Sequence, residues 1–144
     1  MTKLFIGSDH GALELKDKLV ANLQMLKDIE LVDCGTFDTQ SVDYPDIADN
    51  VVKKVLEDKA NLGILCCGTG IGISIKANRN KGIRAALVYD KFTSQMAKEH
   101  NNANILCLGG RTTSFEEASE YISIWLNSNY EGGRHQRRLD KLDS

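Results

Sequence analysis

A glycine-rich turn near the middle of the chain has a thiol at its start. Cys67 precedes Gly68-Thr69-Gly70-Ile71-Gly72, which connects the apolar run 62–67 to an amphipathic stretch. Where a strand leads into a helix, backbone N–H groups and the helix dipole can hold an anion and can favour a thiolate. The sequence therefore makes Cys67 a candidate base or nucleophile beside an anion site, although a cysteine taken alone is more often a packing residue. A tight turn that uses glycine only for its backbone freedom is an equally good interpretation of the turn alone.

The glycine spacing argues against a nucleotide site. The turn reads G-x-G-x-G, and Ile73 stands where the third glycine of the dinucleotide motif would be. The lysine of a phosphate-binding P-loop is also missing from the turn. The turn therefore suits a phosphate or an oxyanion better than a nucleotide.

Two histidines add proton carriers that work near neutral pH. His10 and His100 are two of the three histidines, and both stand in expected loops, before Gly11 and Asn101. We expect both on the ligand side of the fold, as acids or bases. Taken alone, either one is more often a structural histidine.

Guanidinium groups, which suit phosphate oxygens, gather toward the C-terminus. Four of the six arginines stand there: Arg111, Arg134, Arg137 and Arg138. A basic C-terminal segment is also typical of a solvated face or a subunit contact. Asp9 and the segment Asp43-Tyr44-Pro45 add groups that can bind hydroxyls, although an aspartate after a strand can equally cap a helix.

Apolar runs alternate with amphipathic stretches along the chain. Strands are predicted over residues 3–8, 30–34, 62–67, 84–88 and 104–108. A helix between the first two strands has one apolar face: Leu15, Leu19, Leu23 and Leu26. The next helix has another: Ile47, Val51 and Val55. Helices are also predicted over 71–78 and 91–99, and from a capping box at 114–117 through Trp125.

Nearly apolar strands that alternate with helices indicate a parallel sheet covered on both faces. We predict one α/β domain over residues 1–144, a doubly wound, Rossmann-like, five-stranded parallel sheet with helices on both faces. Ligands of such folds bind beyond the carboxyl ends of the strands. The polar and glycine-rich segments fall at those ends: 8–11, 34–36, 67–70, 88–90 and 108–111.

The composition is that of an ordinary globular protein, with 42% hydrophobic and 26% charged residues in 144. A net charge of -2 with dispersed Lys and Arg gives no electrostatic reason to expect nucleic acid or an anionic membrane as partner. With no signal peptide and no apolar run of ~18 residues, we expect a cytoplasmic protein. The four cysteines lack metal-type spacing, so reduced thiols and no metal are expected.

Six segments carry a resemblance that covers nearly the whole chain. They are Gly7-Ser8-Asp9-His10-Gly11, Asp43-Tyr44-Pro45, Cys67-Gly68-Thr69-Gly70-Ile71-Gly72-Ile73-Ser74, His100-Asn101, Leu108-Gly109-Gly110-Arg111 and Tyr130-Glu131-Gly132-Gly133-Arg134-His135. In order and spacing they closely resemble ribose-5-phosphate isomerase B, a family that also includes galactose-6-phosphate isomerase subunits. The resemblance implies an isomerase that interconverts D-ribose 5-phosphate and D-ribulose 5-phosphate through an enediolate, in the non-oxidative pentose phosphate pathway, without metal or organic cofactor.

The same resemblance implies roles for single residues. Cys67 matches the base that moves a proton between C2 and C1, His100 the acid/base that opens the sugar ring, and Thr69 the residue that handles protons on O1 and O2. The enediolate is expected on the backbone of Gly68, Thr69, Gly70, Ile71 and Gly72. The expected contacts to sugar hydroxyls are Asp9, Tyr44 and Asn101, and those to the phosphate are His10, Arg111, Arg134 and Arg138.

Some relatives have a carboxylate in the following helix in place of the cysteine, but residues 73–76 contain no acid here. The resemblance also implies a homodimer, sometimes paired into a tetramer, whose active sites take residues from two subunits. The C-terminal tail 130–144 is then expected to contribute to the dimer and the site. Two other functions stay open: an isomerase of allose or galactose 6-phosphate from the same family, and a non-catalytic phosphate- or nucleotide-binding module.

Overall fold

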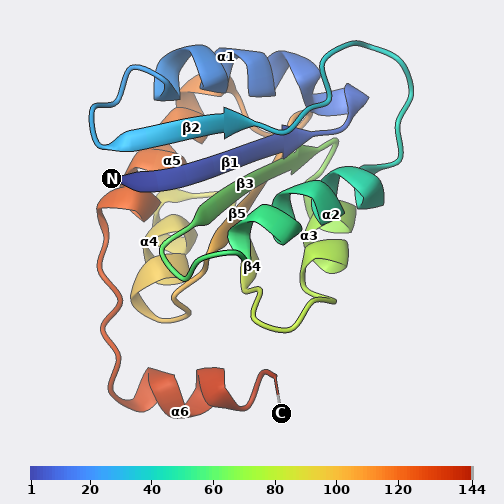
Figure 1. Ribbon diagram of the computed structural model, residues 1–144. Helices are drawn as coiled ribbons and strands as arrows, with labels where there is room; N and C mark the ends of the chain where they lie inside the picture. Colours follow the sequence, from blue (N-terminus) through green and yellow to red (C-terminus); the bar gives the residue numbers. More distant parts are fainter. Residues whose placement is uncertain (144) are drawn as a thin grey trace.

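The computed structural model describes residues 1–143, which form one α/β domain around a five-stranded parallel sheet (Figure 1). The strands are β1 (Thr2–Ser8), β2 (Ile29–Asp33), β3 (Leu62–Cys67), β4 (Ala85–Leu87) and β5 (Ile105–Gly109). They lie in the order β2-β1-β3-β5-β4. The predicted fold class is confirmed. The order reverses between β1 and β3, the point where such sheets open a crevice for a ligand.

The helices cover both faces of the sheet. They are α1 (Leu13–Leu23), α2 (Tyr44–Val55), α3 (Ile71–Ala77), α4 (Lys91–Glu99), α5 (Phe115–Asn127) and α6 (Arg134–Asp140), with a short 3-10 turn at His10–Ala12. One core lies under α1, α4 and α5 and includes the fully buried Trp125. The other lies under α2 and α3. Because both faces are covered, the central strands β3 and β5 are buried almost throughout.

Two elements have the bounds that the sequence predicts, the strand 62–67 and the helix 91–99. The capping box is also confirmed, because Ser114 Oγ accepts the Glu117 N–H at 3.1 Å and Glu117 Oε1 accepts the Ser114 N–H at 3.0 Å. Leu26 was wrongly placed on the first helical face. Helix α1 ends at Leu23, and Leu26 lies beyond it with 44% of its surface exposed.

Two glycines let α2 lie directly on the sheet. A Cβ atom on Gly7 of β1 would stand 2.9 Å from Ile47 Cγ2, and one on Gly63 of β3 would stand 2.9 Å from Val51 Cγ1. Real Cβ atoms do not approach other atoms so closely. Any larger residue at either position would therefore push α2 away from the strands.

The C-terminal segment departs from the layered part of the fold. After α5 the chain runs down one side of the domain and ends in α6, which Figure 1 shows apart from the sheet layers. The sequence predicted no element here, yet residues 134–140 form two turns of helix. Within residues 1–143, none of the helices has both the length and the apolar composition needed to cross a membrane.

Candidate active site

The turn between β3 and α3 places Cys67 under a helix N-terminus. Cys67 ends β3 and is 5% exposed, and its Sγ accepts the backbone N–H of Gly70 at 3.1 Å. Gly70 has φ +79°, which favours glycine, and is the N-cap of α3. Ile71 N–H donates to Thr69 Oγ1 at 3.2 Å. The first N–H groups of a helix have no partner within it, so this turn can bind an anion next to the sulfur.

The other three thiols are poor candidates for a base. Cys66 faces the opposite core and is fully buried, which raises its pKa to about 12. Burial also raises the pKa of Cys107 well above the usual value. The pKa of Cys34 is raised by burial and by the charge of Asp33. Cys66 is thus a structural thiol on the opposite side of β3 from Cys67, because side chains alternate along a strand.

Asp9 and Arg111 converge beside the turn. A Cβ atom on Gly68 would stand 3.4 Å from Arg111 Nη1, and one on Gly11 would stand 3.4 Å from Asp9 Oδ1 and 3.7 Å from Arg111 Nη2. Arg111 also donates its backbone N–H to the Gly68 carbonyl at 2.9 Å. Asp9 Oδ1 is buried without a hydrogen-bond partner among residues 1–143. Since buried polar atoms are normally paired, this oxygen is available to a substrate hydroxyl.

His10 and Tyr44 complete this edge of the sheet. His10 Nδ1 accepts the Val42 N–H at 3.1 Å, so Nε2 carries the proton of the neutral ring and can donate to a ligand. Tyr44 begins α2 and lies against the first turn of α3, because a Cβ atom on Gly72 would stand 2.6 Å from Tyr44 Cζ. Asp9, His10, Tyr44, the 67–72 turn and Arg111 therefore form one cluster at the carboxyl ends of the strands. We call it the carboxyl-edge cluster.

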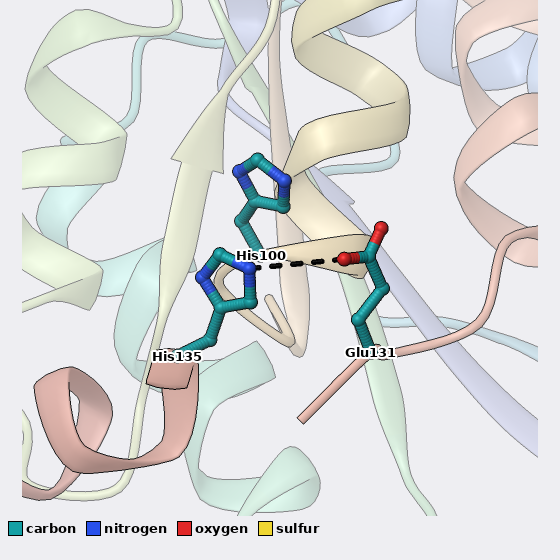
Figure 2. Close-up of side chains that lie close together, drawn as sticks. All are labelled: His100, Glu131 and His135. Atoms are coloured by element: carbon teal, nitrogen blue, oxygen red, sulfur yellow. Dashed lines mark ion pairs between the residues drawn. The ribbon is translucent and has the colours of Figure 1, made fainter. Parts of the chain in front are cut away.

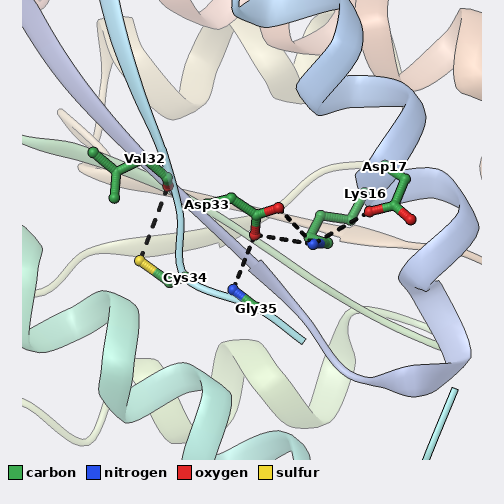
Figure 3. A network of polar contacts seen from close by, with 6 residues as sticks. All are labelled: Lys16, Asp17, Val32, Asp33, Cys34 and Gly35. Atoms are coloured by element: carbon green, nitrogen blue, oxygen red, sulfur yellow. Dashed lines mark hydrogen bonds and ion pairs between the residues drawn. The ribbon is translucent and has the colours of Figure 1, made fainter. Parts of the chain in front are cut away.

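The sequence analysis missed a buried ion pair that joins α1 to the end of β2 (Figure 3). The Lys16 side chain of α1 is fully buried, and its Nζ donates to both carboxylate oxygens of Asp33, at 2.9 and 2.7 Å. Asp17 Oδ1 lies 3.3 Å from the same nitrogen. The available signal was a lysine beside Leu15 on an otherwise apolar helix face.

This ion pair is connected to the site through the backbone. Asp33 Oδ1 accepts the Gly35 N–H at 2.9 Å, and the Gly35 carbonyl accepts the Ser8 N–H at 2.7 Å. The Thr36 N–H donates back to the Ser8 carbonyl at 2.8 Å. Since Ser8 precedes Asp9, the pair helps to hold the end of β1 in place.

The remaining site candidates lie at the opposite edge of the sheet. His100 is the C-cap of α4, and the exposed Asn101 follows it. The exposed Arg134 and Arg138 lie on α6, next to this edge. We expected His100 at the carboxyl edge of the sheet, and within one chain this prediction is wrong. Helix α4 returns the chain to the start of β5, so His100 lies at the amino edge. Five residues of strand, about 16 Å of chain, then separate that start from the carboxyl edge.

His100 is part of a compact group at this amino edge (Figure 2). Its ring stacks on that of His135, with centroids 4.2 Å apart and planes at 19°. His135 is buried, and its Nε2 lies 3.8 Å from Glu131 Oε2. Burial, and then the neighbouring His100, lower the pKa of His135 from its usual value. We call His100, Glu131 and His135 the amino-edge cluster.

Comparison with known proteins defines the class to which this fold and site belong. The model of the ribose/galactose isomerase family matches residues 4–142, so the chain belongs to that family. Ribose-5-phosphate isomerase B of Escherichia coli is 39% identical over 142 residues, which cover 99% of this chain and 95% of that protein. The probable ribose-5-phosphate isomerase B of Mycoplasma genitalium is 44% identical, over 96% of this chain and 92% of that protein.

Solved structures agree with this assignment. A ribose 5-phosphate isomerase from Thermotoga maritima superposes with a TM-score of 0.93 at 50% identity, over 98% of this chain and 97% of that one. The Mycoplasma genitalium ribose-5-phosphate isomerase B with bound ribulose-5-phosphate superposes with a TM-score of 0.92 at 44% identity, over 98% and 93% of the two chains.

Proposed function

We propose that this chain is a ribose-5-phosphate isomerase that interconverts D-ribose 5-phosphate and D-ribulose 5-phosphate. The observation that carries the proposal is the position of Cys67. The thiol ends a strand at the topological switch point, beneath an N-terminal helix turn, in a chain whose relatives bear this name. An aldose–ketose isomerase needs a base beside donors for an oxyanion, and this junction supplies both.

In the proposed mechanism Cys67, as the thiolate, removes the C2 proton of the open-chain aldose. The electron pair moves into a C1–C2 double bond, and the charge on O1 is stabilised by N–H groups of residues 68–72. The Thr69 hydroxyl moves a proton between O2 and O1, and the Cys67 thiol returns its proton to C1. The product is the ketose, and Cys67 is again a thiolate.

The substrate contacts follow from the carboxyl-edge cluster. Asp9 Oδ1, buried and without a hydrogen-bond partner in the described part of the chain, accepts a sugar hydroxyl, and the Tyr44 hydroxyl over Gly72 supplies another contact. His10 and Arg111 bind the phosphate, since both can donate hydrogen bonds and the guanidinium is always charged.

We also propose that the functional unit contains at least two copies of the chain. His100 must reach the sugar to open its ring, but within one chain it lies at the far edge of the sheet from Cys67. A second copy that packs its amino edge against the carboxyl-edge cluster would supply His100 and Asn101 to the sugar. The same copy would supply the exposed Arg134 and Arg138 to the phosphate. The tail 130–144 would then belong to both the dimer and the site, and two such dimers could pair into a tetramer.

Free thiols favour a reducing compartment, and all four cysteines are free. We therefore propose a cytoplasmic enzyme. From the family resemblance we also propose that turnover requires neither a metal nor an organic cofactor.

The first experiment measures kcat/KM for ribose 5-phosphate, allose 6-phosphate and galactose 6-phosphate. The proposal expects the pentose to be preferred. Preference for a hexose phosphate would support the aldose–ketose isomerisation but show that the proposed pentose substrate is wrong. Binding without turnover of any of the three would overturn the assignment as an isomerase.

The second experiment mixes two inactive variants, Cys67→Ala and His100→Asn, after mild dissociation, and assays the cyclic substrate. If each site takes Cys67 from one copy and His100 from another, mixed dimers regain one intact site. Random exchange then restores about a quarter of wild-type activity. Mass spectrometry verifies that the subunits have exchanged. If the mixture stays inactive after exchange, the two subunits do not share active sites.

A further inference from the structure

The amino-edge cluster brings together three potential metal ligands from three segments of the chain. His100 lies at the end of α4, Glu131 lies in the connection after α5, and His135 lies in the first turn of α6. One ligand atom from each residue falls within 4.8 Å of the other two. In Figure 2 the His100 ring and the Glu131 carboxylate both lie next to the His135 ring. Residues up to 35 positions apart are thus assembled at one point.

The ligand types select a class of ion. Two imidazoles and one carboxylate are a ligand set of zinc and of similar divalent transition ions, and such sites keep a fourth position open. Magnesium and calcium prefer oxygen ligands and do not match two nitrogens. The negative charge comes from Glu131, and a second carboxylate oxygen, Glu99 Oε2, is buried at the same end of α4 without a partner among residues 1–143. Arg134 and Arg138 of α6 oppose a cation, so the site requires the Glu131 charge.

The tail allows the small adjustment that metal binding requires. Bonds of about 2.0–2.1 Å to zinc place tetrahedral ligand atoms roughly 3.3 Å apart. The stacked rings must therefore turn until their nitrogens point to a common centre. Gly132 and Gly133, with φ +69° and +58°, stand between Glu131 and His135, and no atom would lie within 4 Å of a Cβ on either. Meanwhile the Glu131 N–H holds the tail on the Glu99 carbonyl at 3.0 Å.

We propose that His100, Glu131 and His135 form a binding site for a divalent transition ion, with Zn²⁺ as the natural occupant. Zinc bound there occupies a nitrogen of His100. If His100 opens the sugar ring, as the proposed function holds, zinc inhibits turnover of the cyclic substrate. The binding itself does not depend on the proposed function.

Cobalt provides the direct test, because tetrahedral Co²⁺ has a visible absorption that hexa-aquo Co²⁺ lacks. Wild-type protein titrated with Co²⁺ should develop this absorption with one ion per chain, and Zn²⁺ should bleach it. His135→Gln and Glu131→Gln should each weaken binding by about tenfold or more. Asp140→Asn is the matched control, since it removes a carboxylate from the same tail outside the cluster and should bind like wild type. Circular dichroism confirms that each variant is folded.

Two results would overturn the site. One is Co²⁺ binding that is unchanged in both cluster variants. The other is a strong thiolate-to-cobalt absorption in the near ultraviolet, which would place the ion on a cysteine. Activity is measured separately: zinc should inhibit wild type and Asp140→Asn equally, with recovery after chelation. Cobalt binding without zinc inhibition would support the metal site but contradict the role of His100 in ring opening. The metal site and the proposed function can therefore be refuted independently.

Discussion

The ammonium group of Lys16 is fully buried and donates to both oxygens of the Asp33 carboxylate, at 2.9 and 2.7 Å. A buried charge is stable only when it is paired and hydrogen-bonded, and each member of this pair meets the need of the other. Because Asp33 also accepts the Gly35 N–H, the pair fixes the loop that is bonded to Ser8. The order of the carboxyl-edge cluster therefore depends partly on an ion pair that lies outside it.

Lys16→Met should lower the free energy of unfolding by about 3 kcal/mol, because it leaves Asp33 largely buried without its partner. Lys18→Met is the control on the same helix. Lys18 is 57% exposed and pairs with the exposed Glu14, so its loss should cost less than about 0.5 kcal/mol. Urea unfolding measures both. Equal losses in the two variants would show that the buried pair contributes nothing of its own.

Cys67→Ala should lower kcat by about 10²–10⁴-fold while the protein stays folded, because a missing base removes proton transfer and little else. Cys66→Ala should instead lower stability and leave turnover nearly unchanged. It removes a buried thiol from the other core, costs about 1 kcal/mol of stability and leaves turnover within about twofold. Initial rates and thermal unfolding of the two variants separate the roles. A normal rate in Cys67→Ala would remove the proposed base.

Gly72→Ala should leave stability little changed, because the gain in helix propensity of up to about 1 kcal/mol is offset by the cost of displacing the Tyr44 ring. It should also raise KM for the sugar phosphate by about fivefold, the equivalent of one hydrogen bond. The new methyl group would meet the Tyr44 ring, which must move. The control is Gly72→Ala in a Tyr44→Phe background, where KM should not rise further. A further rise there would mean that the methyl group acts on another contact.

The capping box of α4 should make stability depend on pH in acid. Asp90 Oδ1 accepts the Thr93 N–H and hydroxyl, both at 2.7 Å, and these bonds lower the pKa of Asp90 from its usual 3.8. The unfolded chain thus binds this proton first. The contribution of Asp90 is fully present above about pH 5 and is lost as the pH falls through the lowered pKa. Asp90→Asn, which does not titrate, should show a shallower loss of stability below about pH 4 in urea unfolding. If the free energy of unfolding falls with pH as steeply as in the wild type, other carboxylates cause the loss of stability in acid.

The parts of the fold that sequence predicts best are those with strong local signals. The strand 62–67 is a continuous apolar run closed by glycine, and its bounds are those of β3. Cys67, Asp9 and Arg111 converge because parallel strands present their carboxyl ends at one edge, so topology alone brings these residues together.

The misses have equally definite causes. His100 follows a helix rather than a strand, and a helix in such a fold returns the chain to the opposite edge. Lys16 was missed because its partner Asp33 is 17 residues away, on a strand, with no pattern that links them. The sequence did not predict helix α6 because its seven residues are mostly polar and charged, and only His135 and Leu139 are buried.

Gly7 and Gly63 look like packing positions, but their effect extends to the start of α2, where Tyr44 lies over the first turn of α3. The distance of α2 from the sheet is short because Gly7 and Gly63 have a hydrogen where every other residue has a Cβ atom. A natural variant with alanine at either position would be classified as a conservative core change. Its phenotype would nevertheless be altered substrate affinity. Packing positions within the sheet would thus influence substrate affinity without touching the substrate.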